Sequence, residues 1–301
     1  MKVLYFGIVV VGVVILFVVL FSFALLCYVT KPKRTSMEHS MQREKSKNLW
    51  GEFDVSEREA CDIVTDDGYL LHGILMKRPG RKYVIVTHGY TYNRWGSVKY
   101  ANMFYHFGYN VYLYDLRHHG ENANQFCSMG HHEKNDILAV AAYLRKRFGE
   151  DIEIGLHGES LGAASSMLAL GESDQFAFCV ADCGFADLGQ LLEYLCKKLL
   201  HLPEKISHLA SFACKVRYGY RLDELQPVEA VRKNVRTPVL FIHGKEDDFI
   251  PPEHCDKLYD VSGVKKERVL FDGAAHAESF QSDKERYYQV VADFLRDIGQ
   301  I

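Results

Sequence analysis

Between Ile152 and Gly162, a short apolar run leads directly into a Gly-x-Ser-x-Gly pentapeptide, and small residues follow it. The apolar run predicts a buried strand, and the segment after Gly162 predicts a helix. Ser160 therefore lies at the tip of a sharp strand–turn–helix connection. Such a turn brings the strand and helix backbones close together, so it needs small neighbours, which Gly158 and Gly162 supply.

This arrangement makes Ser160 a candidate nucleophile, because the turn exposes its hydroxyl at the end of a strand. The backbone N–H of Leu161, at the helix N-terminus, then points toward the place where an oxyanion would form. The alternative is a glycine-rich turn with a solvated serine, since the pentapeptide alone is a weak signal. The partners available to the serine decide between these interpretations.

A serine hydroxyl needs a general base, and the base needs an orienting carboxylate. The expected chain order is serine, then Asp or Glu, then histidine. Asp247 follows the strand-like run Pro238–His243, and His276 follows the run Arg268–Phe271. Asp247 and His276 are therefore expected at the same edge of the sheet as Ser160. Three other carboxylates compete for the acid role: Glu246, Asp248 and Asp182.

An oxyanion site needs a second backbone donor besides Leu161. The apolar run that ends at Thr87 is followed by His88-Gly89-Tyr90, and the N–H of Tyr90 is our candidate. Gly89 lets the backbone approach a substrate, and we expect His88 to brace the loop. The nearby aromatic residues Tyr90, Tyr92 and Trp95 suggest an apolar acyl pocket or ordinary loop packing.

The cysteine and histidine patterns indicate no metal site and no disulfide framework. The 8 cysteines have no framework spacing, so buried reduced thiols are the default in a chain this large. Among the 14 histidines, the pairs His118-His119 and His131-His132 lack a regular ligand pattern with carboxylates. We therefore expect no metal.

No charged residue occurs from Val3 to Thr30, and nearly all of these residues are apolar. A helix of this length is about 42 Å long at 1.5 Å per residue, enough to span a bilayer core of roughly 30 Å. A signal peptide is the alternative, but its apolar region is shorter and ends at a small-residue cleavage site. Basic residues between Lys31 and Lys47 follow the run, which predicts a cytoplasmic catalytic part.

The chain divides into a transmembrane anchor (1–30), a basic juxtamembrane linker (31–50) and one domain (51–301). Strand-like and helical runs alternate in this domain, which predicts a mainly parallel sheet covered on both faces. A hairpin around Asp66-Asp67-Gly68 adds antiparallel strands at one edge. The segment 185–236 interrupts the alternation with leucine-rich helical sequence, which we interpret as a lid; ordinary packing helices are the alternative.

Several ordered motifs from about Glu52 to the end resemble the α/β-hydrolase superfamily, and in particular bacterial membrane-anchored hydrolases described as serine aminopeptidase-like or esterase-like. The Gly158–Gly162 pentapeptide carries the resemblance together with other segments: His88-Gly89, Asp115-Leu116-Arg117-His118-His119-Gly120 (similar to D-x-R-x-H-G), His243–Asp247 with Ile250-Pro251, and Gly273–His276. Glu121-Asn122 departs from the Gly-x-Ser that relatives often carry there.

The resemblance implies an α/β-hydrolase fold with a small helical lid, a Ser160–Asp247–His276 triad and no cofactor. We expect hydrolysis of a carboxylic ester or related acyl bond on a small-molecule substrate. The membrane is the expected partner through the N-terminal helix, and no nucleic acid is expected. A peptidase of aminopeptidase type and a non-catalytic membrane-tethered binding protein are the alternatives. The peptidase needs an acid for the substrate amine: Glu193, Glu204, Asp223 or Glu224.

Overall fold

The computed structural model describes residues 2–301, so Met1 of the predicted anchor lies outside the described residues. The chain divides into two compact units. The smaller unit combines Met1–Pro32 with Leu188–Leu225, and the larger combines Lys33–Asp187 with Gln226–Ile301. The predicted nucleophile, base and acid all belong to the larger unit.

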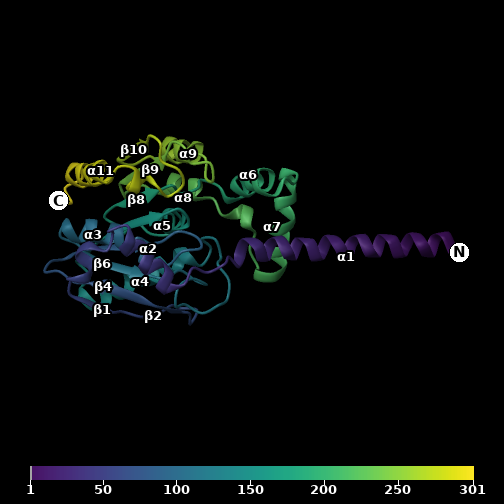
Figure 1. Ribbon diagram of the computed structural model, residues 1–301, viewed down its shortest axis with the longest axis horizontal. Helices are drawn as coiled ribbons and strands as arrows, with labels where there is room; N and C mark the ends of the chain where they lie inside the picture. Colours follow the sequence, from purple (N-terminus) through teal and green to yellow (C-terminus); the bar gives the residue numbers. More distant parts are fainter. Residues whose placement is uncertain (1) are drawn as a thin grey trace. The chain divides into compact units, whose positions relative to one another are not determined.

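An 8-stranded sheet forms the centre of the larger unit (Figure 1). Strands from β6 to β10 pair in parallel, whereas β1 and β4 pair antiparallel at one edge. This agrees with the predicted parallel sheet with antiparallel strands at one edge. In spatial order the strands are β1 (Arg58–Ala60), β4 (Gly73–Met76), β6 (Asn110–Tyr114), β5 (Lys82–Thr87), β7 (Glu153–Glu159), β8 (Cys179–Asp182), β9 (Val239–Gly244) and β10 (Lys266–Phe271).

The predicted hairpin around Gly68 is divided between two sheets. Its inner strands, β2 (Ile63–Val64) and β3 (Leu70–Leu71), pair with each other as a separate 2-stranded sheet. The flanking strands β1 and β4 pair antiparallel in the main sheet. The hairpin therefore bends off the sheet edge after Ala60 and returns to it at Gly73.

Helices cover both faces of the sheet, because successive strand residues point to opposite sides. Val84 and Val86 of β5 join a buried cluster with α3 (Val98–His106) and α11 (Lys284–Asp297), beside the short α10 (Ser279–Ser282). Four helices pack against one another and the other face: α4 (Glu133–Phe148), α5 (Leu161–Leu170), α8 (Pro227–Lys233) and α9 (Glu253–Val261).

The segment predicted as a basic linker contains helix α2 (Met37–Ser46), which belongs to the larger unit. The hydroxyl of Ser36 caps its N-terminus by accepting the backbone N–H of His39. Ser40 and Glu44 are buried on one side of the helix, one turn apart. The next residues form the 3-10 helix η1 (Gly51–Asp54), whose Phe53 joins the core. This segment is therefore a folded part of the larger unit.

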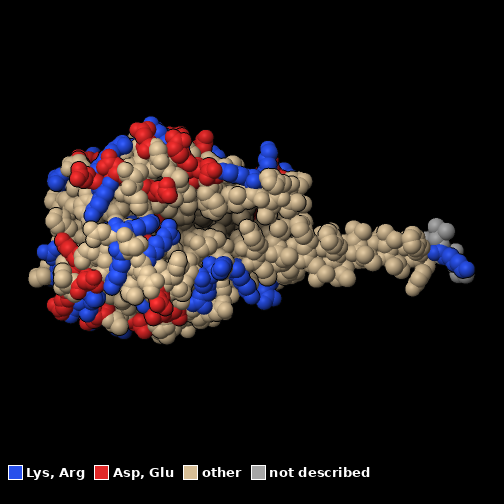
Figure 2. All heavy atoms as spheres, viewed as in Figure 1, with Lys and Arg blue, Asp and Glu red and all other residues tan. Residues whose placement is uncertain are grey.

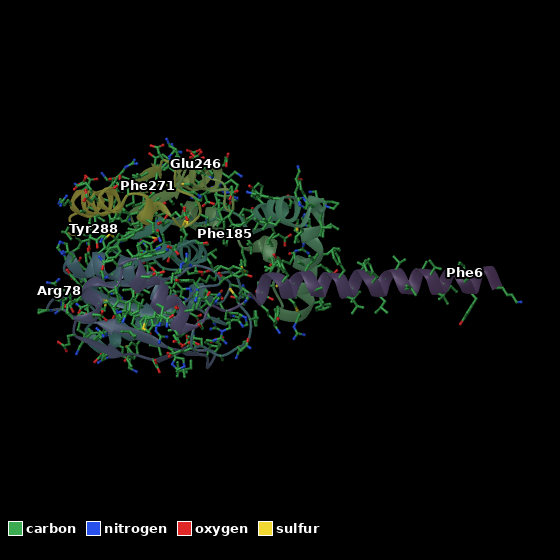
Figure 3. All side chains as sticks on the ribbon, viewed as in Figure 1. Phe6, Arg78, Phe185, Glu246, Phe271 and Tyr288 are labelled. Atoms are coloured by element: carbon green, nitrogen blue, oxygen red, sulfur yellow. The ribbon has the colours of Figure 1, made fainter. Side chains whose placement is uncertain are left out.

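In the smaller unit, the long helix α1 (Lys2–Thr30) contacts α7 (Ser207–Tyr218). Apolar side chains project from α1 along its exposed length, with Phe6 near its N-terminal end (Figure 3). The lid segment contributes α6 (Leu188–Leu200) and the 3-10 helices η3 (Glu204–Ile206) and η4 (Leu222–Glu224). Because α8 belongs to the larger unit, only residues 188–225 of the predicted lid are separate. Covering of the site by this segment stays a prediction.

Candidate active site

Ser160 occupies the turn between strand β7, which ends at Glu159, and helix α5, which begins at Leu161. Its backbone has φ 56° and ψ −115°, a conformation that non-glycine residues rarely adopt. Backbone strain of this kind costs about 1–3 kcal/mol and concentrates at functional sites. The strained turn matches the predicted connection and places Ser160 where the strand and helix meet.

The two glycines of the pentapeptide are required by close backbone packing. A Cβ atom on Gly158 would overlap the backbone of Gly162, and one on Gly162 would overlap the carbonyl oxygen of Thr87. Any side chain at either position would therefore push helix α5 away from β5 or β7. The prediction that this turn needs small neighbours is confirmed by these contacts.

Ser160, His276 and Asp247 form one hydrogen-bonded chain. The hydroxyl of Ser160 lies 2.9 Å from Nε2 of His276. Nδ1 of the same ring lies 2.7 Å from Oδ2 of Asp247. Because a carboxylate accepts hydrogen bonds, Nδ1 carries the proton and Nε2 is left free to accept the serine hydroxyl. The geometry is therefore that of a nucleophile, a base and an orienting acid.

The carboxylate of Asp247 is buried and fully hydrogen-bonded. Its Oδ1 accepts the backbone N–H groups of Phe249 and Ile250 at 3.0 and 2.8 Å. Its Oδ2 also lies 3.2 Å from Nε2 of His243. Burial alone would raise the pKa of Asp247, but hydrogen bonds from His243 and His276 hold it well below its usual range.

His243 is a site residue that sequence reasoning missed. Burial opposes its charged form, but the hydrogen bond with Asp247 outweighs burial and raises the pKa of His243 to about 10. The Nε2–H also donates to the carbonyl of Ile250 at 2.8 Å. The charged ring thus ties Asp247 to the loop that follows β9. Its sequence signal was its position at the end of the strand, four residues before Asp247.

The competing carboxylates lie elsewhere. Glu246 and Asp248 are exposed, and Figure 3 shows Glu246 at the surface of the larger unit. Asp182 is buried, but it accepts the hydroxyls of Tyr287 at 3.1 Å and Ser279 at 3.3 Å. Burial raises the pKa of Asp182 to about 6. The structure brings Asp247, and none of these three, within hydrogen-bonding distance of His276.

The predicted oxyanion loop passes beside the serine. A Cβ atom on Gly89 would lie 3.4 Å from the Cβ of Ser160, and Tyr90 lines the same cavity as Ser160 and His276. Leu161 is the first residue of α5, where a backbone N–H has no partner within the helix. The two predicted donors therefore come from segments adjacent to the hydroxyl of Ser160.

Two buried histidines brace this loop as neutral rings. Nε2 of His88 accepts the N–H of Leu116 at 2.9 Å, and its Nδ1–H donates to the carbonyl of Gly89 at 2.7 Å. Nε2 of His119 accepts the N–H of Thr91 at 3.1 Å. Burial lowers the pKa of His88 to about 4 and that of His119 to about 3. The D-x-R-x-H-G segment thus supports the loop that carries Tyr90.

A largely buried ion pair lines the same cavity as Ser160. Nζ of Lys99 is 2.7 Å from Oε2 of Glu159, and the hydroxyl of Tyr100 donates to the same oxygen at 2.6 Å. Burial would raise the pKa of Glu159, but Lys99 outweighs burial and lowers it. Sequence reasoning also missed this pair, because Lys99 and Glu159 are joined only by the fold.

The residues around His276 offer one grouping with metal-ligand atoms. Sγ of Cys183 and ligand atoms of Asp247 and His276 lie within 4.8 Å of one another. Burial raises the pKa of the Cys183 thiol well above its usual value, and a metal needs the thiolate. Asp247 and His276 are already hydrogen-bonded to each other. The chemistry that suits this arrangement is proton transfer to and from Ser160.

Comparison with known proteins identifies the family of this chain. Residues 97–300 match the model of the prolyl oligopeptidase family. The chain is 32% identical over 273 residues to the uncharacterized protein YqkD of Bacillus subtilis, covering 89% of each chain. It is 26% identical over 201 residues to the uncharacterized membrane protein YNL320W of Saccharomyces cerevisiae, covering 65% of this chain and 63% of that one.

A solved structure, the Pyrococcus furiosus esterase Pf2001, has a similar fold. In one crystal form its TM-score is 0.69 at 23% identity, covering 89% of this chain and 97% of the esterase. In a second crystal form the TM-score is 0.67 at 25% identity, covering 82% and 96%. The likeness spans most of both chains.

Proposed function

The chain belongs to the prolyl oligopeptidase family within the α/β-hydrolase superfamily, and we therefore propose that it cleaves a carboxylic ester or related acyl bond through an acyl-enzyme on Ser160. The family match and the structural likeness confirm the predicted superfamily and fold class. They also make the chain a serine hydrolase of the α/β fold. The finer assignment of bond type and residues is our proposal.

The observation that carries the proposal is the hydrogen-bonded chain of Ser160, His276 and Asp247 on the strained turn. In the proposed reaction, Nε2 of His276 takes the serine proton as Oγ attacks the substrate carbonyl. The N–H groups of Leu161 and Tyr90 stabilise the tetrahedral oxyanion. His276 then protonates the leaving group, and an activated water hydrolyses the acyl-enzyme.

Replacement of the nucleophile tests the proposal. We expect Ser160→Ala to lower the rate of hydrolysis of a short p-nitrophenyl ester by at least about three orders of magnitude. Ser173→Ala, on a loop outside the cavity, is the matched control and should keep its rate. A fluorophosphonate probe should label the wild type at Ser160. Unchanged hydrolysis by Ser160→Ala would rule out the assignment.

A peptidase acting on short peptides is the second candidate, because the matching family is named for a peptidase. It needs an acid for the substrate amine, and two acids of the predicted lid already have cationic partners. Glu193 lies 3.6 Å from Nζ of Lys205, and Glu204 lies 2.9 Å from Nζ of Lys197. This pairing favours the esterase. Faster cleavage of aminoacyl-arylamides than of esters would favour the peptidase.

A membrane-tethered binding protein with an inactive hydrolase fold is the remaining alternative. It predicts that well-folded protein resists fluorophosphonate labelling. The hydrogen-bonded chain at Ser160 argues against it, because its three side chains lie in the order that acyl transfer needs.

The N-terminal helix is a membrane span or a signal sequence by its length and composition, since Tyr5–Thr30 has a mean hydropathy of 3.3. We propose that it is a single-pass anchor with the hydrolase on the cytoplasmic side. Support comes from the basic residues after the span and from a yeast relative described as a membrane protein. The cysteines other than Cys27 are buried and free, as in a reducing compartment.

A further inference from the structure

The cavity beside Ser160 is lined mainly by charged and polar side chains. It has a volume of about 790 Å³ and includes Ser160 and His276 in its wall. The predicted aromatic lining is present only in part, because Trp95 packs with Trp50 and Phe53 instead. The remaining wall carries four basic and three acidic side chains: Arg43, Lys47, Lys99, Lys284, Glu44, Glu159 and Glu278.

The charges of the wall differ in how they are compensated. Lys99 is buried, Glu159 is 12% exposed, and the two neutralise each other at 2.7 Å. Glu44 is only 3% exposed, and its Oε1 accepts the hydroxyl of Tyr92 at 2.7 Å. The Lys99–Glu159 pair therefore adds little net charge, and the Glu44 carboxylate is buried beneath the surface of the wall. The exposed charges there are three cations and a single acid, Glu278.

The three exposed cations come from two separate walls. Arg43 lies in the last turn of α2, Lys47 caps the C-terminus of that helix one turn later, and Lys284 begins α11. Among the described residues, no carboxylate lies within 4.0 Å of their nitrogen atoms. Lys and Arg side chains gather over α2 on this face of the unit (Figure 2). The mouth therefore carries more exposed positive than negative charge, and its three cations have no carboxylate partner.

The α2 wall is held in place by hydrogen bonds to the loop that follows Tyr90. Besides the Tyr92–Glu44 contact, the hydroxyl of Ser40 donates to Asn93 at 2.8 Å. The backbone N–H of Thr35 donates to the carbonyl of Thr91 at 3.2 Å. The cations of α2 are thus carried on an element fixed beside the candidate oxyanion loop.

We propose that the cations at the cavity mouth bind an anionic group, a carboxylate or a phosphate, on the ester that Ser160 cleaves. A positive, partly enclosed mouth attracts anionic substrates and raises their local concentration. Arg43 presents a planar fork that matches a carboxylate or phosphate, and Lys47 and Lys284 add point charges. This inference rests on the proposed function and names the substrate class of the same site.

Three p-nitrophenyl esters of equal acyl length test the inference with full-length protein in non-ionic detergent. The hexanoate is neutral, the adipate monoester is anionic and the 6-aminohexanoate is cationic. We expect kcat/KM for the anionic ester to exceed that for the neutral ester by about tenfold at low salt. Because exposed charges are screened, the ratio should fall as ionic strength rises.

Substitutions of the three cations test which side chains produce the preference for the anionic ester. The combined variant R43Q/K47Q/K284Q should lower the anionic-to-neutral ratio by at least about fivefold. Lys45→Gln is the control, because Lys45 lies on the same helix, outside the cavity and over the ring of Trp50. It should leave the ratio unchanged. A ratio near one in the wild type, an unchanged ratio in the triple variant, or a preference for the cationic ester would each overturn the inference.

A binding measurement separates failure of this inference from failure of the proposed function. On the Ser160→Ala background, the adipate monoester should bind at least about tenfold more tightly than the hexanoate, and the triple variant should remove the difference. Absence of Ser160-dependent turnover with this binding preference intact would reject only the function. Turnover without the preference would reject only the inference.

Anionic lipid headgroups offer the same chemistry as an anionic ester. Assays with phosphatidylglycerol and with phosphatidylcholine vesicles distinguish the two sources. If the cations serve the substrate, the wild-type preference for the anionic ester persists in both. Its loss with phosphatidylglycerol alone would assign the cations to headgroups and overturn the substrate assignment.

Discussion

At the residue scale, the buried carboxylate of Asp247 organises the site. It accepts two backbone N–H groups on Oδ1 and faces His276 and His243 with Oδ2. We expect Asp247→Asn to lower kcat/KM by about 10³–10⁴-fold, because an amide donates to Nδ1 and stabilises the wrong tautomer of His276. Ester hydrolysis by purified protein measures this. Asp248→Asn, at the exposed neighbouring position, is the control. A loss of kcat/KM in Asp248→Asn as large as that in Asp247→Asn would contradict the assignment.

His157 provides a prediction about stability and pH. Burial lowers the pKa of its ring to about 3, and Nε2 lies 3.0 Å from the hydroxyl of Tyr287. In the unfolded chain this ring titrates near 6.5. Between about pH 3 and pH 6.5, His157 is therefore protonated in the unfolded chain and neutral in the folded one. The stabilisation from the neutral ring is lost as pH falls from about 6.5 to about 3.

Substitution of His157 removes this dependence. The difference in free energy of unfolding between the wild type and His157→Gln should shrink as pH is lowered from 8 toward 4. Denaturant titration at several pH values measures it. A constant difference for His157→Gln over the whole range would refute the assignment of a neutral buried ring.

The residues of the site differ in how far sequence predicts them. Ser160, Asp247 and His276 each carry a motif at the end of a strand, so their meeting at one sheet edge follows from chain order. His243 and Lys99 carry no motif for their contacts. The contact of His243 with Asp247 depends on how the loop after β9 folds back. The contact of Lys99 with Glu159 depends on which elements pack side by side.

At the scale of the element, α2 shows how a polar helix becomes part of a site. The hydroxyl of Tyr92 is the donor that satisfies Oε1 of the buried Glu44. Removing a donor from a buried carboxylate costs about 1–3 kcal/mol. We therefore expect Tyr92→Phe to lower the free energy of unfolding by about that amount, measured by denaturant titration.

The same substitution should also reduce kcat/KM severalfold, because the loop next to Tyr90 loses its tie to α2. Tyr105→Phe is the control, since the Tyr105 ring stacks with Arg78 at the surface. If Tyr92→Phe and Tyr105→Phe change the free energy of unfolding and kcat/KM equally, the hydrogen bond to Glu44 contributes specifically to neither.

Elements with a clear apolar run were predicted from the sequence, including strands β5, β7, β9 and β10 and helix α5. Helices α2 and α9 were not predicted. The sequence of α2 is mostly polar, and only contacts with the 91–93 loop bury its inner face. Because polar contacts with this loop bury the inner face of α2, the helix needs no apolar stripe, and its sequence shows none that is clear.

At the scale of the whole molecule, the proposed anchor predicts the location of the protein. The full chain should remain with membranes after extraction with alkaline carbonate, because Tyr5–Thr30 is long and apolar enough to cross a bilayer. Release into the soluble fraction would instead favour a cleaved signal sequence. In intact cells, protease added from outside should leave the hydrolase uncut, whereas cutting before lysis would reverse the proposed orientation.

The sequence by itself determined the strand–turn–helix connection at Ser160, the mainly parallel sheet and the order of the site residues. These features depend on local backbone geometry and on hydrophobic period, which neighbouring residues encode. Only the tertiary structure decided that His243 supports Asp247, that Lys99 neutralises Glu159, and that α2 forms a cationic wall of the cavity. Each of these contacts joins segments far apart in the chain or depends on burial, so it exists only once the core has packed.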